Sequence, residues 1–200
     1  MKKTAFLLGL IVLLSCDKTT PTPATSQTKE TKVETNEEGL KHITYHKNGL
    51  VNVVTDIKND KRNGLRLEVD SRGNVINQNM YENDELHGIQ LKYGTSGKLK
   101  LKATYKHGVL DGEYVKYQKD GKNYQESCFY VNGKKDGKAS WYYSSGKVSM
   151  TYNYENGNIN GLAKKYYDIS GALKSEVMFK DGNMVGEWKD VTGNTENGKQ

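Results

Sequence analysis

The sequence predicts an all-β fold, an elongated single-layer antiparallel meander of about six and a half stacked β-hairpin repeats. Three observations predict it. Glycines recur every 24 or 25 residues, apolar and polar residues alternate along the runs between them, and tyrosines hold fixed positions within each repeat. A fixed period of this length is typical of repeat architectures, and alternation with a period of two is typical of strands with one apolar face.

The first 15 residues have the pattern of a signal peptide. A basic pair, Lys2 and Lys3, precedes an apolar segment at residues 5–14, which is shorter than the roughly 20 residues that a membrane-spanning helix needs. The ending LLSC at residues 13–16 resembles a bacterial lipobox. That resemblance implies cleavage before Cys16 and lipidation of its thiol and new amino group. The alternative is an ordinary secretory signal followed by an incidental cysteine.

Lipidation of Cys16 would anchor the mature chain to a membrane leaflet outside the cytoplasm. We expect a lipoprotein of the outer membrane. The inner membrane is the alternative, because Asp17 directly after the cysteine resembles a retention signal of some bacteria. Residues 16–39 contain both prolines of the chain and show no apolar periodicity, so we expect the lipidated cysteine to be followed by a flexible tether.

The repeat domain is expected at residues 40–193, with a polar tail at residues 194–200. The first glycines of the units are Gly64, Gly88, Gly112, Gly137, Gly161 and Gly186. The glycines of the turns within the units are Gly49, Gly73, Gly97, Gly121, Gly146 and Gly171. Asn-Gly and Asp-Gly pairs such as Asn132-Gly133 favour tight hairpin turns, because glycine accepts positive φ without a steric penalty.

One hairpin predicts its own register. If residues 95–97 form a three-residue loop, the apolar residues of both strands fall on one face. The expected pairs are Tyr93 with Leu99, Leu91 with Leu101 and Ile89 with Ala103. The unit at residues 112–137 has one extra residue after its turn, and we expect a bulge there.

Aromatic residues recur at two phases of the repeat. Five residues after the unit glycine come Val69, Tyr93, Tyr117, Tyr142, Tyr166 and Val191. The second half of the unit carries Tyr81, Tyr105, Tyr130, Tyr154 and Phe179. Because a single-layer sheet has no second sheet to pack against, we expect these rows to form the core, with about 0.2–1 kcal/mol from each cross-strand pair.

The pattern Tyr-x-Asn-Gly-x-x-x-Gly, followed after four residues by Tyr, resembles the bacterial MORN-repeat variant family. Residues 130–137 and 154–161 fit it best, and the resemblance covers residues 42–193. It implies hairpins stacked into an elongated, twisted antiparallel sheet. Some bacterial members are labelled antitoxin-like by similarity. The first unit departs from the pattern at Asp84 and Val69, which we interpret as capping or edge variation.

No residue pattern indicates catalysis, and we expect neither enzyme activity nor a cofactor. His42 and His46 fall on one strand face, but no cysteine or carboxylate cluster completes a metal site, so we expect none. His87 and His107 each precede a glycine and are interpreted as turn residues. Cys128 has no histidine near it in sequence, which favours a packing role over a nucleophilic one.

The charge of the chain argues against nucleic acid as a partner. The formal net charge is +6 and falls to +4 when Lys2 and Lys3 leave with the signal (6 − 2), and the remaining lysines are interspersed with Asp and Glu. Nucleic-acid binders usually gather basic charge on one patch or stripe. We therefore interpret these charges as a solvated surface.

These observations predict a non-enzymatic cell-envelope lipoprotein whose sheet is a platform for protein–protein or surface contacts. We expect a protein partner of unknown identity to bind the concave face, lined by Tyr93, Tyr117, Tyr142 and Tyr166. A second hypothesis is an antitoxin-like or immunity-like inhibitor of a toxin.

A third hypothesis is a cell-wall or glycan-binding module for an envelope polysaccharide. Its candidate residues are Trp141, Tyr142, Tyr143 and Trp188, because Trp-Tyr-Tyr followed by Ser-Gly-Lys resembles choline-binding or glucan-binding repeats. Aromatic cages and sugar platforms need several rings at matched spacing.

Overall fold

The computed structural model describes residues 31–36 and 39–191, which form a single antiparallel sheet of 15 strands without a helix. The first eight strands are β1 (Thr31–Asn36), β2 (Gly39–Tyr45), β3 (Val51–Lys58), β4 (Lys61–Val69), β5 (Val75–Glu82), β6 (Glu85–Tyr93), β7 (Leu99–Lys106) and β8 (Val109–Tyr117). The others are β9 (Tyr124–Val131), β10 (Lys134–Tyr142), β11 (Val148–Glu155), β12 (Asn158–Ile159), β13 (Gly161–Tyr166), β14 (Leu173–Lys180) and β15 (Asn183–Asp190).

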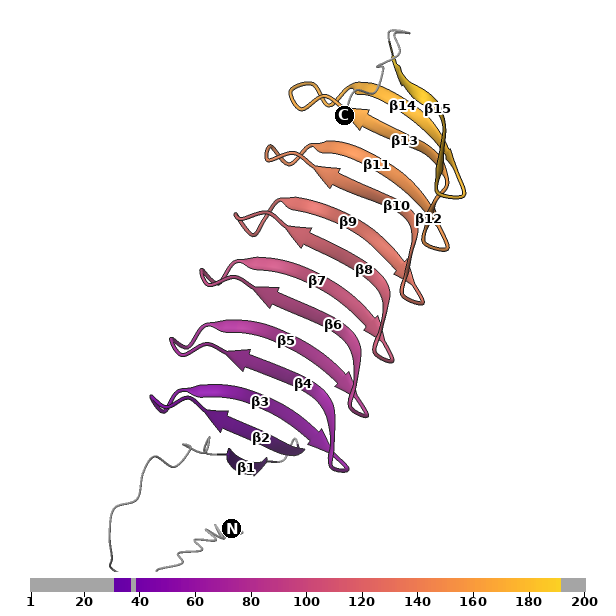
Figure 1. Cartoon of the computed structure of the whole chain (residues 1–200). Coiled ribbons are helices and arrows are strands. Elements are labelled where there is room, and N and C mark those ends of the chain that lie inside the picture. Colours follow the sequence, from indigo (N-terminus) through magenta and orange to yellow (C-terminus); the bar gives the residue numbers. More distant parts are fainter. Residues whose placement is uncertain (1–30, 37–38, 192–200) are drawn as a thin grey trace, which may run out of the picture.

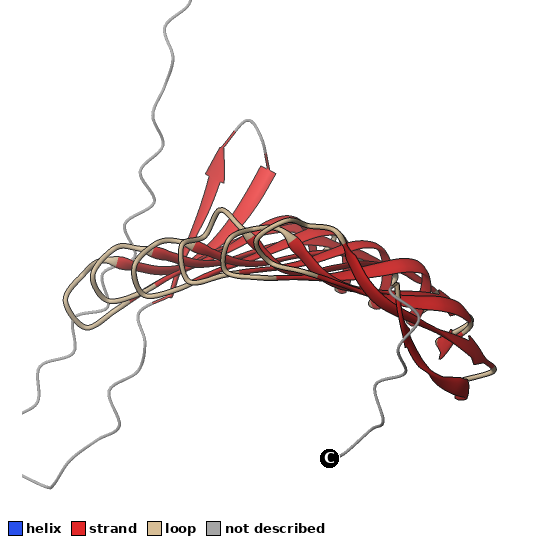
Figure 2. Cartoon of the chain, turned by 90° about the horizontal axis from the view of Figure 1, so that it is seen from above, coloured by secondary structure: helices blue, strands red, loops and turns tan. Residues whose placement is uncertain are grey.

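The strands lie side by side in chain order, apart from the two-residue β12, which pairs with β11 beside the start of β13. Figure 1 shows the hairpins stacked from β2 to β15 into an elongated, twisted array. Seen from above in Figure 2, the array is a single curved layer. The predicted fold class, a single-layer meander of stacked hairpins, is therefore confirmed. The described residues include no helix long and apolar enough to cross a membrane.

The expected tether is wrong for its last part. Residues 31–36 form β1, which pairs with β2 from Thr31 opposite Thr44 to Asn36 opposite Gly39. Residues 31–36 alternate β-branched with polar or charged residues, a pattern that suits a strand. The expected signal peptide at residues 1–15, Cys16, the first part of the tether and the tail at residues 194–200 lie outside the described residues.

Neighbouring turns are joined by backbone hydrogen bonds of 2.8–3.0 Å. In each bond the amide of one turn donates to a carbonyl oxygen of the preceding hairpin. The pairs, donor first, are Asp84 and Arg62, Gly108 and Leu86, Gly133 and Leu110, Gly157 and Lys135, and Gly182 and Ile159. Each bond links one hairpin to the next at the same position of the repeat. Stability is thus built from nearest-neighbour contacts, as in other repeat proteins.

The two faces of the sheet differ in how side chains are covered. Residues opposite each other in an antiparallel pair project from the same face, so the register assigns each residue to a face. We call face A the face that bears Ala103, Ala139 and Ala163, and face B the face that bears Val115. Five of the six buried apolar residues lie on face A, namely Ala103, Cys128, Ala139, Ala163 and Val177.

Those buried residues correct the expectation that the aromatic rows form the core. The rings are partly exposed, and the fully covered positions between them carry small side chains. In a single layer, only a small side chain can be covered entirely by its neighbours on the same face. The aromatic residues therefore flank the core.

The two aromatic rows lie on opposite faces. The row of the second half-unit lies on face A, where Tyr105, Tyr130 and Tyr154 are directly opposite the unit glycines 88, 112 and 137. Without a Cβ, a strand glycine exposes its backbone, and an aromatic residue across the pair can cover it. This pairing explains why the glycines and the rings recur with the same period.

The predicted register is right at the loop and wrong beyond it. Tyr93 does pair with Leu99, but Leu91 pairs with Lys102 and Ile89 with Thr104. The register shifts between Lys92 and Tyr93, because one residue of β7 is left unpaired in a bulge. The same shift recurs in the hairpins that follow, at Lys116/Tyr117, Trp141/Tyr142 and Lys165/Tyr166.

The extra residue of the unit at 112–137 lies in the turn and does not create a separate bulge. The amide of Gln118 donates to the carbonyl of Asn123, whereas the equivalent bond in the preceding unit joins Gly94 to Lys98 across one residue fewer. The carboxylate of Asp120 accepts hydrogen bonds from the amides of Lys122 and Asn123, at 2.9 and 3.0 Å, and holds the longer loop.

Candidate interaction surface

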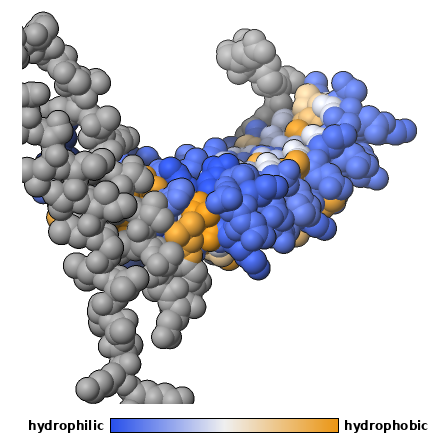
Figure 3. Space-filling view, turned by 90° about the horizontal axis from the view of Figure 1, so that it is seen from below, coloured by the Kyte–Doolittle hydropathy of each residue, from blue (hydrophilic) through white to orange (hydrophobic). Residues whose placement is uncertain are grey.

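Face B exposes many large apolar side chains. They are 36–53% exposed and come from strands along the whole array. They are Leu65, Met80, Ile89, Val109, Tyr124, Phe129, Val131, Leu162, Met178 and Val185. Figure 3 shows apolar residues, in orange, that reach the surface among hydrophilic residues, in blue. Exposed apolar surface gathered on one face is typical of an interaction site.

The tyrosines predicted to line a binding face share face B. Tyr93, Tyr117, Tyr142 and Tyr166 each end a strand, opposite Leu99, Tyr124, Val148 and Leu173 respectively. Each tyrosine therefore packs beside an apolar or aromatic partner near the loop edge of the sheet. Sequence reasoning predicted that these residues lie together, and the structure brings them together.

Three of these rings form a chain across two hairpins. The ring of Tyr124 lies edge-on between Tyr117 and Tyr142, with centroid distances of 5.4 and 5.6 Å. Burial is the main cause that raises the pKa of Tyr117. The hydroxyl of Tyr142 is 2.9 Å from Oγ of Ser127, and the hydroxyl of Tyr93 donates to Oε1 of Gln78 at the same distance. The rings are thus fixed in place, which lowers the entropy lost on binding.

The four residues of the glycan hypothesis do not form one surface. Trp141 and Trp188 lie on face A, whereas Tyr142 lies on face B. The hydroxyl of Tyr143 donates to the carbonyl of Tyr166 at 2.7 Å and joins neighbouring loops.

Both tryptophans already pack against groups of the chain itself. The ring of Trp141 meets Tyr152 edge-on at 5.5 Å, and Nζ of Lys135 is 5.1 Å from its centroid. Nζ of Lys165 lies 4.1 Å from the ring centroid of Trp188. Adjacent residues of a strand point to opposite faces, so the side chains of Trp141 and Tyr142 cannot belong to one binding surface.

A charged cluster lies on face A beside Cys128. Oε1 of Glu126 is 2.7 Å from Nζ of Lys135, and Oε2 is 3.4 Å from Nζ of Lys116. Burial opposes ionisation of Glu126, but the hydrogen bond and charge of Lys135, together with Lys116, hold the pKa of its carboxyl below the ordinary value. Glu126 therefore stays ionised although it is only 8% exposed.

Cys128 is itself buried, and burial raises the pKa of its thiol. A reactive cysteine needs the thiolate form, which this environment disfavours at neutral pH. The position of Cys128 thus agrees with a packing role.

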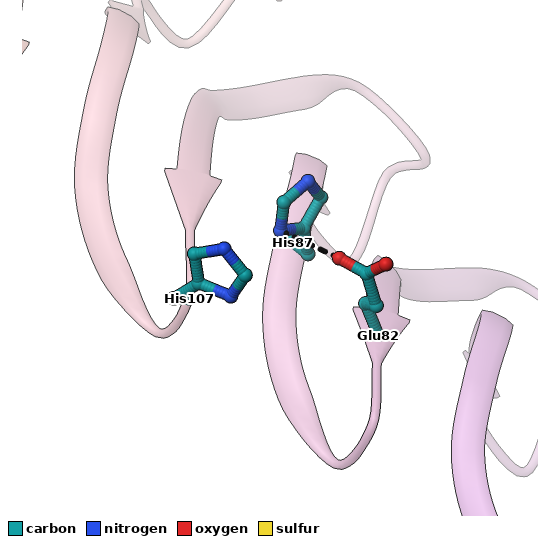
Figure 4. Close-up of side chains that lie close together, drawn as sticks. All are labelled: Glu82, His87 and His107. Atoms are coloured by element: carbon teal, nitrogen blue, oxygen red, sulfur yellow. Dashed lines mark ion pairs between the residues drawn. The ribbon is translucent and has the colours of Figure 1, made fainter.

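His42 lies on a strand and His107 in a turn as expected, whereas His46 follows β2 and His87 lies within β6. Nε2 of His46 is 2.8 Å from the carbonyl oxygen of Val69, in the next repeat, and His42 is exposed on β2. In contrast, His87 and His107 approach each other and Glu82 (Figure 4). Each of the three residues offers one possible ligand atom, and these three atoms lie within 4.8 Å of one another. Sequence reasoning missed this group because it joins two hairpins. Aligning the units by their turns would have placed both histidines at contacting positions.

Comparison with known families agrees with the geometry. The family model described as MORN repeat variant matches residues 86–107, which include most of β6 and all of β7, and residues 135–156, which include most of β10 and all of β11. The two matched stretches are equivalent hairpins of the array, and they confirm the resemblance seen in the sequence. None of the curated proteins compared with the chain matches it.

Proposed function

We propose that this chain, which carries MORN-variant repeats, is a non-enzymatic lipoprotein of the cell envelope that binds a protein partner on face B. The repeats indicate a repeat-based interaction module. The observation that carries the finer proposal is the series of exposed apolar side chains on face B, among them Ile89 at 45% and Phe129 at 50% exposure. Burying such side chains against a partner removes apolar surface from water and favours association.

The polar groups of face B suit a protein partner as well. Nζ of Lys102 lies 2.6 Å from Oε2 of Glu113, and Nζ of Lys164 lies 3.9 Å from Oε2 of Glu176. These pairs lie among apolar residues on the same face. Protein interfaces combine an apolar centre with such polar groups at the rim. The elongated, curved sheet allows contact over several repeats (Figures 1 and 2).

An interaction role is tested by charge substitutions on the two faces. Phe129→Glu places a charge in the centre of face B, whereas Lys92→Glu alters the charge of an exposed residue on face A. After crosslinking in intact cells, the partner should be recovered with the unchanged chain and with Lys92→Glu and be lost with Phe129→Glu. Recovery that survives Phe129→Glu and is lost with Lys92→Glu would assign the interaction to face A.

The envelope location has its own test. The support for it is the lipobox-like ending at Cys16 and the signal-like residues before it. Cys16→Ser removes the thiol that would carry the lipid, so the chain should move from the membrane fraction to the soluble fraction. Cys128→Ser is the matched control, because Cys128 is buried in the sheet, and this variant should stay with the membrane. Membrane retention of Cys16→Ser would contradict lipidation.

A further inference from the structure

Two neighbouring hairpin turns bring two imidazoles and the carboxylate of Glu82 together (Figure 4). Glu82 ends β5, His87 lies within β6, and His107 follows β7 in the next turn. The two imidazole rings meet edge to face, with centroids 4.9 Å apart. Oε2 of Glu82 is 3.2 Å from Nδ1 of His87, and Oε2 of Glu85 is 3.4 Å from Nδ1 of His107.

The fold does not require histidine at either position. In the repeat alignment, His87 corresponds to Asp111 and Asp136, which also precede unit glycines. The carboxylates of those aspartates accept hydrogen bonds from backbone amides in the next turn, at Asn132 and Asn156, with distances of 3.1 and 3.2 Å.

His107 corresponds to those same two asparagines, and it has positive φ as they do. The contact between consecutive turns is thus an Asp–Asn contact in two units and a His–His contact in this one. In this unit both positions carry histidine, the side chain that most often binds metal ions in proteins.

A carboxylate precedes this turn in two units, at Glu82 here and at Glu155 in a later unit, but only Glu82 is followed by histidines at the contacting positions. The residue that precedes the turn is Glu82 here, whereas Lys106 and Lys180 occupy the equivalent places of other units. A lysine at this position would repel a cation. The hairpin turn therefore accepts a residue of either charge at this position. The turn conformation does not require the negative charge of Glu82 beside His87.

One ring nitrogen of His87 lacks a hydrogen-bond partner among the described residues. Its Nδ1 is almost inaccessible to solvent and makes no hydrogen bond within the described part of the chain. The 3.2 Å contact with Glu82 meets the distance for an ion pair, but not the geometry of a hydrogen bond. Buried polar atoms without a partner are uncommon in folded proteins, and an ion is one of the groups that satisfies them.

We propose that Glu82, His87 and His107 bind a Zn²⁺ ion, with water as the fourth ligand. Zinc is bound by imidazole nitrogen and carboxylate oxygen at about 2.0–2.2 Å in tetrahedral geometry, which separates the ligand atoms by about 3.4 Å. The present separations of up to 4.8 Å close to that value by side-chain rotation. The side chains of Glu82 and His107 are 48% and 62% exposed and are free to rotate, while the backbone stays in place.

Bound zinc would link two consecutive repeats. Glu82 and His87 belong to one hairpin turn and His107 to the next, where the amide of Gly108 already donates to the carbonyl of Leu86 at 2.8 Å. A ligand that binds the folded state and not the unfolded chain stabilises the folded state. Zinc should therefore raise the thermal unfolding midpoint of the protein.

The test is a zinc titration of the purified full chain by isothermal calorimetry, together with thermal unfolding. One Zn²⁺ should bind per chain and raise the unfolding midpoint, whereas Mg²⁺ should do neither, because it prefers oxygen ligands. The decisive variant combines His87→Asp with His107→Asn, which installs the contact of the following units and so preserves the fold. Loss of an outer-shell partner alone weakens metal binding about 10–100-fold, and this variant should lose at least that much affinity.

The controls separate this site from other ligands of the chain. His42→Ala removes an exposed histidine elsewhere on the sheet and should leave zinc affinity unchanged. All variants keep Cys16 and Cys128, so zinc held by thiols would bind equally to every protein and would overturn the proposal. Glu82→Gln should weaken binding more than Glu85→Gln, and the reverse order would contradict the assignment of Glu82 as the third ligand.

Discussion

Gly112 shows how one residue sets the path of a strand. Its φ is 124°, a conformation that side chains disfavour, and a Cβ built there would lie 2.9 Å from Cβ of Thr104 on the neighbouring strand. Gly137 occupies the same position of the next unit with φ 74°, and a Cβ added to it would meet no atom of a non-adjacent residue within 4 Å. Both glycines have positive φ, but a side chain would also meet a close neighbour only at Gly112.

Gly112→Ala should therefore destabilise the fold more than Gly137→Ala. A backbone conformation that side chains rarely adopt costs a non-glycine residue about 1–3 kcal/mol, so both variants should lose stability. Only Gly112→Ala adds the clash with Thr104. Urea unfolding of both variants measures the difference, and equal losses would contradict the close strand contact at Gly112.

Glu126 predicts an acid dependence of stability. Its folded pKa is lower than that of an unfolded glutamate, so it stabilises the fold at pH values above the ordinary glutamate pKa of about 4.3. This contribution is lost as the pH falls through that value toward the lower folded pKa. Glu126→Gln should lower the free energy of unfolding at pH 7 by about 1–3 kcal/mol and flatten its pH dependence between pH 5 and pH 3.

Glu113→Gln is the matched control for Glu126→Gln. Glu113 pairs with Lys102, but its side chain is 47% exposed, and exposed pairs contribute about 0–1 kcal/mol. Chemical unfolding across the pH range compares the two variants. A pH dependence that is the same in Glu126→Gln and in the unchanged chain would contradict the role of the Glu126 carboxylate.

At the residue scale, the sequence predicted the face on which a side chain lies better than it predicted the side chains in contact with it. Tyr93 and Tyr166 were placed correctly on one face because their phase in the repeat is fixed. The His87–His107 contact was missed because it depends on how two turns stack. Trp141 and Tyr142 were grouped by adjacency in the sequence, although adjacent strand residues point to opposite faces.

A strand of this sheet presents very different environments along its length, as β8 shows. Val115 is 1% exposed and lies under neighbouring side chains, whereas Val109, at the other end of the same strand, is 45% exposed. Val115→Ala removes buried methyl groups and should lower the free energy of unfolding by about 1–3 kcal/mol. Val109→Ala should change it by less than about 0.5 kcal/mol. Thermal or urea unfolding tests this, and similar losses would contradict the described burial.

The hairpin is the element whose existence was predicted well and whose register was predicted badly. The turn glycines fixed the loop, and Tyr93 pairs with Leu99 as expected. The bulge after that pair moves Leu101 opposite Lys92. A bulge depends on the twist and curvature of the sheet, which period-two alternation does not encode. Placing all apolar residues on one face was therefore the wrong criterion for a sheet that is exposed on both faces.

At the scale of the whole molecule, the architecture was predictable because it repeats. Each unit contacts its neighbours, so a period read from glycines and tyrosines defines the complete array. The difference between the faces was not predictable in the same way. It depends on which side chains cover Ala103 and Ala139 on face A and leave Phe129 exposed on face B.

The central claim, a protein interaction surface on face B, is tested most directly by site-specific photo-crosslinking in intact cells. A photoreactive side chain replaces Phe129 on face B or Met184 on face A, two apolar residues that are 50% and 51% exposed. We expect a discrete protein adduct from position 129 and none from position 184. Adducts from position 184 with none from position 129 would contradict the claim.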